Sequence, residues 1–428
     1  MKRPTPAQLK KVTPENLARL GPERLSELLM AEAELRPELK RRLRMELAGG
    51  QGPAHLAAEL DKRLNSLATS RSRIGWRTRP AFLRELEDLR IQIAERLAAL
   101  DRPMARERMW LFMGLARRTA SRVRGRDEEL AEVFRAGAES LGALLGDADP
   151  EASAEALVQL ILADPLGWTD RLDAVLDRAP EALARAALQR FAGAPKAVPG
   201  QAILLRRLAD AAGDIDAFRA TFTEEALATP GVAAEVARRL LAGGRVEEAG
   251  QVLERAGPQR KPSRLFGVRA ASTEIDFGWE SVLIDYLEAA GRAEDAQAAR
   301  WASFERTLSL ERARAFVSRL PDFEDVEAET RAFGLAAAHA DFGRGLAFLM
   351  DWPALPDAAR MIQARPEEIR VSAENAELWA ARLRARQPAA ANLLLRKTAA
   401  QALRRGELAI STRLTQEADS IILDDWQS

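Results

Sequence analysis

Apolar residues recur at helical spacing along most of the chain, and no stretch alternates between apolar and polar residues over the length of a strand. Leucines between residues 53 and 67 step by four, four and three positions, and a second stripe of the same period follows between residues 80 and 100. This pattern predicts an all-α fold with helices over both segments. The stripes consist of Leu56, Leu60, Leu64 and Leu67, and of Phe82, Leu86, Leu89, Ile93, Leu97 and Leu100.

Proline and glycine divide this helical pattern into short elements. Pro37 stands where a first helical turn accepts proline and Gly49 stands where a helix commonly ends, so we expect a helix between them. Residues 109–115, MWLFMGL, are apolar on every side of a helix, which predicts that neighbouring helices enclose this segment. Further helices are expected at about 127–146, 151–163, 180–192 and 199–212.

A weak internal repeat occupies the middle of the chain. Three segments can be superposed on Gly213, Gly244 and Gly291, and the last two share the motif G-R-x-E-[ED]-A. In such a motif the glycine ends one helix, the acidic pair begins the next, and the alanine permits close helix packing. The segments resemble the turns of tetratricopeptide-like hairpins. Because the spacings of 31 and 47 residues differ, we expect an irregular α-solenoid of stacked helical hairpins.

The longer of these two intervals contains a segment without helix signals, residues 257–278. A connection of this length is unusual in a compact domain and is often functional or disordered. We expect disorder or plain packing here, with a binding loop as the alternative. The candidate contact residues of that loop are Arg260, Lys261, Arg264, Phe266 and Arg269.

Composition narrows the class of protein. The chain has 428 residues, of which 47% are hydrophobic and 30% charged, which is typical of a folded protein too long for one small core. It contains no cysteine, which excludes disulfides, thiolate metal sites and cysteine nucleophiles and favours a reducing compartment. Because the sequence shows neither a signal-peptide core nor a long apolar run, we expect a cytoplasmic protein without membrane contact.

The net charge of zero conceals a division of the chain into a basic part and an acidic part. Residues 1–126 contain 28 basic and 15 acidic residues, a net charge of +13, and residues 127–428 carry the balancing −13. We therefore expect a basic N-terminal helical region over 1–126 and an acidic helical-hairpin repeat region over 127–428. Such asymmetry is typical of a protein with an anionic partner, or of two parts that attract each other.

Basic residues gather at one connection between helices. From Lys62 to Arg79 there are six basic side chains and no acidic one, with one indole, Trp76, among them. Arginines before a helix N-terminus favour an anion, and an exposed indole stacks on a base or on an arginine. We expect instead that Trp76 closes the top of the hairpin, since an exposed indole contributes nothing to stability. The candidate contacts for an anion, a nucleic acid or a protein partner are Lys62, Arg63, Arg71, Arg73, Trp76, Arg77 and Arg79.

Motifs for catalysis and cofactor binding are missing from the sequence. Neither G-x-x-x-x-G-K-[ST] nor G-x-G-x-x-G occurs, and the chain has only two histidines, His55 and His339. A metal site would then need carboxylates almost alone, and the acidic run at 322–329 is better explained as the first turn of a helix. We therefore expect no catalytic residue, no cofactor and no metal, and a protein that is not an enzyme.

Three stretches resemble a bacterial family of unknown function that consists of long, alanine- and arginine-rich helical proteins. They span Leu17–Gly49, Ser70–Arg90 and Gly291–Glu329, and the third, with Arg300-Trp301 followed by Phe304-Glu305, is the most specific. The resemblance implies a helical-repeat fold, and it implies no activity, cofactor or catalytic residue.

These observations favour a scaffold or adaptor without enzymatic activity, because helical repeats offer grooves that bind proteins or peptides. A nucleic-acid-binding protein that uses the basic region is the alternative, since basic side chains neutralise phosphates. In a third interpretation the basic region docks on the acidic remainder, within one molecule or between two.

Overall fold

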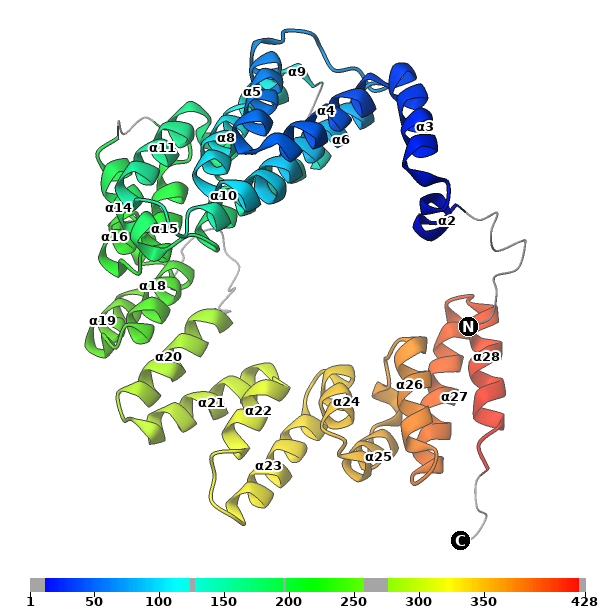
Figure 1. Ribbon diagram of the computed structural model, residues 1–428. Helices are drawn as coiled ribbons and strands as arrows, with labels where there is room; N and C mark the ends of the chain where they lie inside the picture. The colour runs from blue at the N-terminus through cyan, green and yellow to red at the C-terminus, as the bar shows by residue number, and fades with distance from the viewer. Residues whose placement is uncertain (1–11, 124–127, 195–197, 258–275, 423–428) are drawn as a thin grey trace. The chain divides into compact units, whose positions relative to one another are not determined.

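The computed structural model confirms the all-α class. It describes residues 12–123, 128–194, 198–257 and 276–422, and within these ranges no strand forms. One isolated bridge pairs the backbones of Ile74 and Val123. The chain divides into two compact units at Thr223 and Glu224, and neighbouring helices pack as antiparallel pairs within each unit (Figure 1).

The first unit begins with the short α2 and the longer α3 and continues through helix pairs such as α4 with α5 and α11 with α14. A π-helical turn interrupts the predicted helix after residue 91. The helices of this unit are α2 Pro14–Ala18, α3 Gly21–Leu35, α4 Pro37–Gln51, α5 Pro53–Thr69, α6 Arg79–Ile91, η1 Gln92–Leu97, α7 Ala98–Leu100, α8 Arg102–Gly114, α9 Ala116–Arg122, α10 Glu128–Leu144, α11 Pro150–Ala163, α12 Pro165–Trp168, α13 Leu172–Leu176, α14 Glu181–Ala192, α15 Gln201–Ala211 and α16 Ile215–Ala220.

The second unit contains the pairs α18 with α19, α20 with α21, α23 with α24, and α27 with both α26 and α28. Its helices are α17 Glu224–Leu227, α18 Pro230–Ala242, α19 Val246–Ala256, α20 Phe277–Ala289, α21 Ala293–Thr307, α22 Leu310–Val317, α23 Glu324–Ala338, α24 Phe342–Asp351, α25 Leu355–Ala364, η2 Pro366–Glu368, α26 Ala373–Leu383, α27 Pro388–Arg404 and α28 Leu408–Asp419.

The predicted glycine turns join the helices of several pairs. Gly213, Gly244 and Gly291 have φ angles of 65°, 73° and 75°, in the left-handed region, and Gly406 between α27 and α28 repeats this geometry with φ of 79°. In each turn the residue after the glycine donates its N–H to a carbonyl five residues earlier, as in a Schellman motif. These bonds are Asp214 to Ala209 (2.9 Å), Arg245 to Leu240 (2.8 Å), Arg292 to Leu287 (2.8 Å) and Glu407 to Ala402 (2.9 Å).

The shared motif after the glycine has a clear structural basis. In its two full copies the arginine pairs with the second acidic residue, Arg245 with Glu248 at 2.7 Å and Arg292 with Asp295 at 2.8 Å. The acidic residues lie in the first turn of the next helix, where the helix dipole favours negative charge. The alanine that closes each motif is fully buried, which allows the two helices to approach. These alanines are Ala249 and Ala296.

Aromatic rings form much of the core of the second unit. Phe304 lies 5.3 Å from Trp301 and 5.2 Å from Phe348, and Phe348 lies 5.7 Å from Trp352, measured between ring centroids. These rings come from α21, from α24 and from Trp352 directly after it, so they hold together elements that are distant in the sequence. The most specific stretch of the family resemblance is therefore a packing feature.

The leucine stripes are confirmed, with local differences. All four leucines of the first stripe are buried, and so is the middle of the second, whereas Leu100 is exposed where the helix ends. Two predictions were wrong. The helix from Pro37 continues past Gly49 to Gln51, because Gly52 with its positive φ provides the stop. The 109–115 segment is not fully enclosed, because Leu111 stays exposed although α5, η1 and α10 all pack against α8.

The change of charge near residue 126 does not coincide with a boundary between compact units. Helix α10, on the acidic side, packs against α6 and α8 on the basic side, and the Phe134 ring lies 5.3 Å from the Phe112 ring. Ion pairs also cross this point, as between Arg79 and Glu129 at 2.8 Å. The net charge of a stretch depends on its surface residues, whereas the limits of a compact unit depend on which helices share a core.

Candidate functional site

The connection between α5 and α6 is anchored to α9 by its only buried residue, Ile74. The Ile74 N–H donates to the carbonyl of Arg122 at 3.1 Å, in the isolated bridge with Val123. The Gly75 carbonyl then accepts N–H groups from Thr78 and Arg79, at 3.1 and 3.0 Å, which turns the chain into α6. The predicted basic connection is thus an extended segment fixed at its midpoint.

A cleft of about 500 Å³ lies between this connection and α9. Its lining combines four arginines with three hydroxyl groups and contains no carboxylate. The lining residues are Thr69, Ser70, Arg71, Arg73, Arg118, Ser121 and Arg122.

Two of these arginines are held in place by backbone carbonyls, one at the C-terminal end of α5 and one in the connection that follows it. The Arg118 guanidinium donates to the Ala68 carbonyl, and Arg122 Nε donates to the Ser72 carbonyl at 2.9 Å. Burial lowers the pKa of the Arg122 guanidinium, and the nearby positive charge of Arg63 lowers this pKa further. Positive charge is therefore concentrated in the cleft, and a bound anion would neutralise part of this charge.

The other two arginines, Arg71 and Arg73, are exposed. Within the described residues, neither makes a hydrogen bond or an ion pair. Beside them the hydroxyls of Ser70 and Ser72 lie 3.0 Å apart and share a hydrogen bond. The cleft thus offers two arginines with fixed positions and two whose guanidinium donors remain available to a ligand.

Trp76 does not close the hairpin, and that prediction was wrong. The indole is 78% exposed, because Ile74 fills the buried position instead. The Arg77 guanidinium lies over the Trp76 ring, 4.9 Å from its centroid, so the ring stacks on an arginine as the alternative interpretation expected. The indole therefore belongs to the surface and not to the core, three residues along the chain from the lining residue Arg73.

The structure separates the remaining predicted contact residues from the cleft. Lys62 pairs with Glu59, Arg63 forms a double hydrogen bond with Glu85 at 2.7 and 2.6 Å, and Arg79 pairs with Glu129. Five residues of the lining were not among the predicted contacts: Thr69 and Ser70 at the end of α5, and Arg118, Ser121 and Arg122 of α9. The run ARRTASRVRGR at 116–126, as basic as the connection, was the signal that pointed to those of α9.

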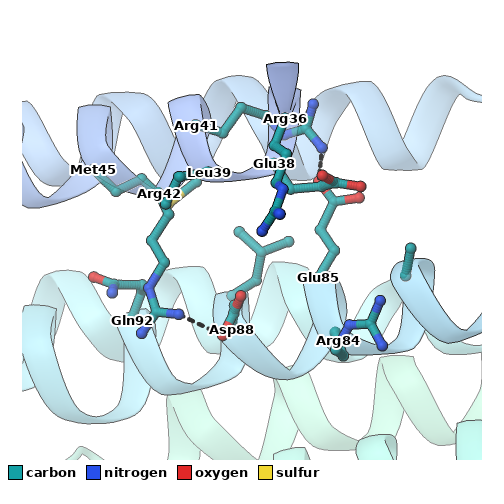
Figure 2. Close-up of a pocket in the computed structure, with 12 residues that line it drawn as sticks. Arg36, Glu38, Leu39, Arg41, Arg42, Met45, Arg84, Glu85, Asp88 and Gln92 are labelled. Carbon is teal, nitrogen blue, oxygen red and sulfur yellow. Dashed lines mark ion pairs between the residues drawn. The ribbon is translucent and has the colours of Figure 1, made fainter. Parts of the chain in front are cut away.

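A second cleft, of about 360 Å³, lies between α4 and α6 and has a different character (Figure 2). Figure 2 shows two ion pairs that span it, from Arg41 to Glu85 at 3.1 Å and from Arg42 to Asp88 at 3.9 Å. The Oε1 atom of Gln92, on the π-helical turn, is buried without a hydrogen-bond partner. Because carboxylates neutralise its arginines, this cleft is a less suitable seat for an anion than the one beside α9.

The candidate binding loop with Arg260, Lys261, Arg264, Phe266 and Arg269 lies outside the described residues. In the part of the chain that the structure does describe, no three metal-ligating side chains are grouped to hold an ion. Among the described helices, none combines the length and the apolar character that a membrane span requires.

The described chain is thus an all-α protein of neighbouring helix pairs, with a cleft of arginines where α5 and α9 meet. Residues 7–199 and residues 198–413 each match the model of a family of unknown function, DUF6880. The chain therefore belongs to this family and carries two copies of it, which confirms the resemblance to a family of unknown function. Comparison with curated proteins and with solved structures gave no match.

Proposed function

We propose that this protein is a non-catalytic scaffold, an irregular α-solenoid of tetratricopeptide-like hairpins that binds a protein partner. The repeated glycine turns and the neighbouring helix pairs support this architecture, since stacked helix pairs expose grooves and helix faces to partners. We also propose a cytoplasmic location, which the absence of cysteine supports.

An exposed apolar face on α3 carries the proposal. This fifteen-residue helix has one buried residue, Ala33, and yet presents four large apolar side chains to solvent. Leu28, Leu29 and Leu35 lie within about 120° of one another around the helix axis, whereas Met30 lies outside this arc. An exposed apolar stripe of this kind marks an interaction site in a folded protein. We propose that an amphipathic helix of the partner packs on it, as helices do in hydrophobic grooves. The four exposed side chains are Leu28 (43%), Leu29 (44%), Met30 (57%) and Leu35 (78%).

The test compares partner capture by two double variants of the full chain. Leu28→Glu with Leu29→Glu places two charges on the apolar face of α3, and Leu378→Glu with Leu403→Glu makes the same change at exposed leucines elsewhere. We expect the α3 variant to capture at least about tenfold less partner than the unmodified chain. Each glutamate that loses its water against the partner weakens the affinity several-fold. The control variant keeps that partner. Equal capture by both variants, or a band that is only a second copy of this chain, contradicts the proposal.

Nucleic-acid binding is the second candidate function, and the cleft beside α9 favours it. Four arginines line this cleft without a carboxylate, and two of them have no partner among the described residues. Phosphate contacts of this kind supply most of the affinity of proteins for nucleic acids.

A further inference from the structure

We propose that the cleft beside α9 binds the phosphates of a single-stranded nucleic acid and that Trp76 stacks on one of its bases. The inference rests on the second candidate function and names its site. Arg118 and Arg122, held by hydrogen bonds, form one wall of the cleft. Arg71 and Arg73, on the connection between α5 and α6, contact the ligand from the other side.

The donor groups suit phosphate. A guanidinium carries five N–H donors in a planar fork that matches a phosphate. The described hydrogen bonds use one nitrogen of Arg118 and two of Arg122, so each fixed arginine keeps donors for a ligand. Of the three lining hydroxyls, that of Thr69 already donates to the Asn65 carbonyl at 2.9 Å and that of Ser121 to the Arg118 carbonyl at 2.7 Å. Only Ser70, whose hydroxyl shares a hydrogen bond with Ser72, can add a neutral donor to those of the arginines. No carboxylate in the lining opposes an anion, unlike in the cleft between α4 and α6.

The exposed aromatic ring of Trp76 decides between classes of anion. Trp76 is not part of the lining, but it follows the lining residue Arg73 by three residues on a connection that Ile74 holds to α9, so the two Cα atoms lie at most roughly 11 Å apart. Its exposed ring gives a base a stacking surface, and every nucleotide carries a base next to its phosphate, whereas a phosphopeptide or an acidic peptide offers such a group only where an aromatic or arginine residue follows. A stacked base must be unpaired, and this favours a single strand over a duplex.

The experiment measures fluorescence anisotropy of the full chain with a short labelled oligouridylate, over a series of salt concentrations. Arg71→Ala with Arg73→Ala is compared with Arg44→Ala and Arg84→Ala, which removes the same charge from exposed arginines outside the cleft. We expect the cleft variant to bind at least ~10-fold more weakly, and its salt slope to fall by about 1.4, since two phosphate contacts are lost. The control variant changes neither quantity by a comparable amount.

Trp76→Ala tests the stacking contact separately. It is expected to weaken binding about tenfold and to leave the salt slope unchanged, because stacking releases no counterions. Trp76→Phe is expected to retain part of the affinity. Helical content and thermal midpoint are measured for every variant, and the exposure of the mutated side chains predicts that both stay at the native values.

The outcomes separate the site from the function. If the unmodified chain binds neither oligouridylate nor single-stranded DNA, nucleic-acid binding itself is overturned. If it binds but the cleft and control variants lose affinity equally, the function stands and the site is overturned. Tighter binding to a matched duplex, or to polyglutamate, overturns the role given to Trp76 and assigns the cleft to another class of partner.

Discussion

At the scale of single residues, glycine sets how closely some helices of this protein approach. Gly345 of α24 faces α23 at such short range that a methyl group there would overlap the carbonyl oxygen of Ala336. Gly334 of α23 has open space around the same position. The two glycines are both helical, so a comparison of their alanine variants isolates packing from helix propensity.

Gly345→Ala is expected to lower the free energy of unfolding by about 1–3 kcal/mol, because backbone has to shift to admit the methyl group. Gly334→Ala is expected to be neutral or to stabilise by up to about 1 kcal/mol, since alanine is the better helix former. Urea denaturation followed by circular dichroism measures both. Loss of stability in Gly334→Ala as large as in Gly345→Ala would contradict the close contact.

The same scale shows why the candidate site was only partly predictable. The basic residues of the connection were visible in the sequence, and Arg71 and Arg73 do line a cleft. What the sequence hid is the contact between Ile74 and Arg122, a pairing across 48 positions that assigns burial to isoleucine and exposure to Trp76. Because a distant residue determines which side chain of the connection is buried, the local sequence shows no periodic pattern that would predict this burial.

At the scale of elements, helix turns were more predictable than helix interiors. The glycines at 213, 244 and 291 were identified because left-handed backbone favours glycine, a rule that acts locally. The equivalent turn at Gly406 escaped because the residues after it lack the acidic pair, although its hydrogen bonds are the same. The π-helical turn at Gln92–Leu97 left no signal, since its apolar stripe keeps helical spacing.

The turn at Gly244 gives the prediction that belongs to this scale. Gly244→Ala is expected to cost about 1–2 kcal/mol, because a Cβ atom disfavours left-handed backbone even where space is open, as it is here. Gly244→Asn is expected to cost less, since asparagine tolerates this conformation best among the other residues. Chemical denaturation of the two variants checks the order. Equal stability of all three chains would mean that the turn does not depend on glycine.

At the scale of the whole molecule, the position where the net charge changes sign differs from the boundary between the two compact units. The boundary at Thr223 and Glu224 follows packing, while the family match changes copy at residues 198–199 and the net charge changes sign near 126. Ion pairs such as Arg102 with Asp147 at 3.1 Å join the basic and acidic stretches within the first unit. Basic and acidic stretches are thus in contact inside one compact unit, and docking of the whole basic region on the acidic remainder stays a prediction.

Two compact units predict that the full chain unfolds in more than one step. Calorimetry is expected to give a total enthalpy larger than the van't Hoff enthalpy, as in proteins with separate cooperative units. Gly142→Ala perturbs the first unit, since its methyl group would overlap the Val175 carbonyl, and Gly345→Ala perturbs the second. Each variant should lower the midpoint of one transition by several degrees and leave the other unchanged. A single transition that both variants shift equally would show that the two units fold as one, because only a shared cooperative step transmits a local loss of stability to the entire chain.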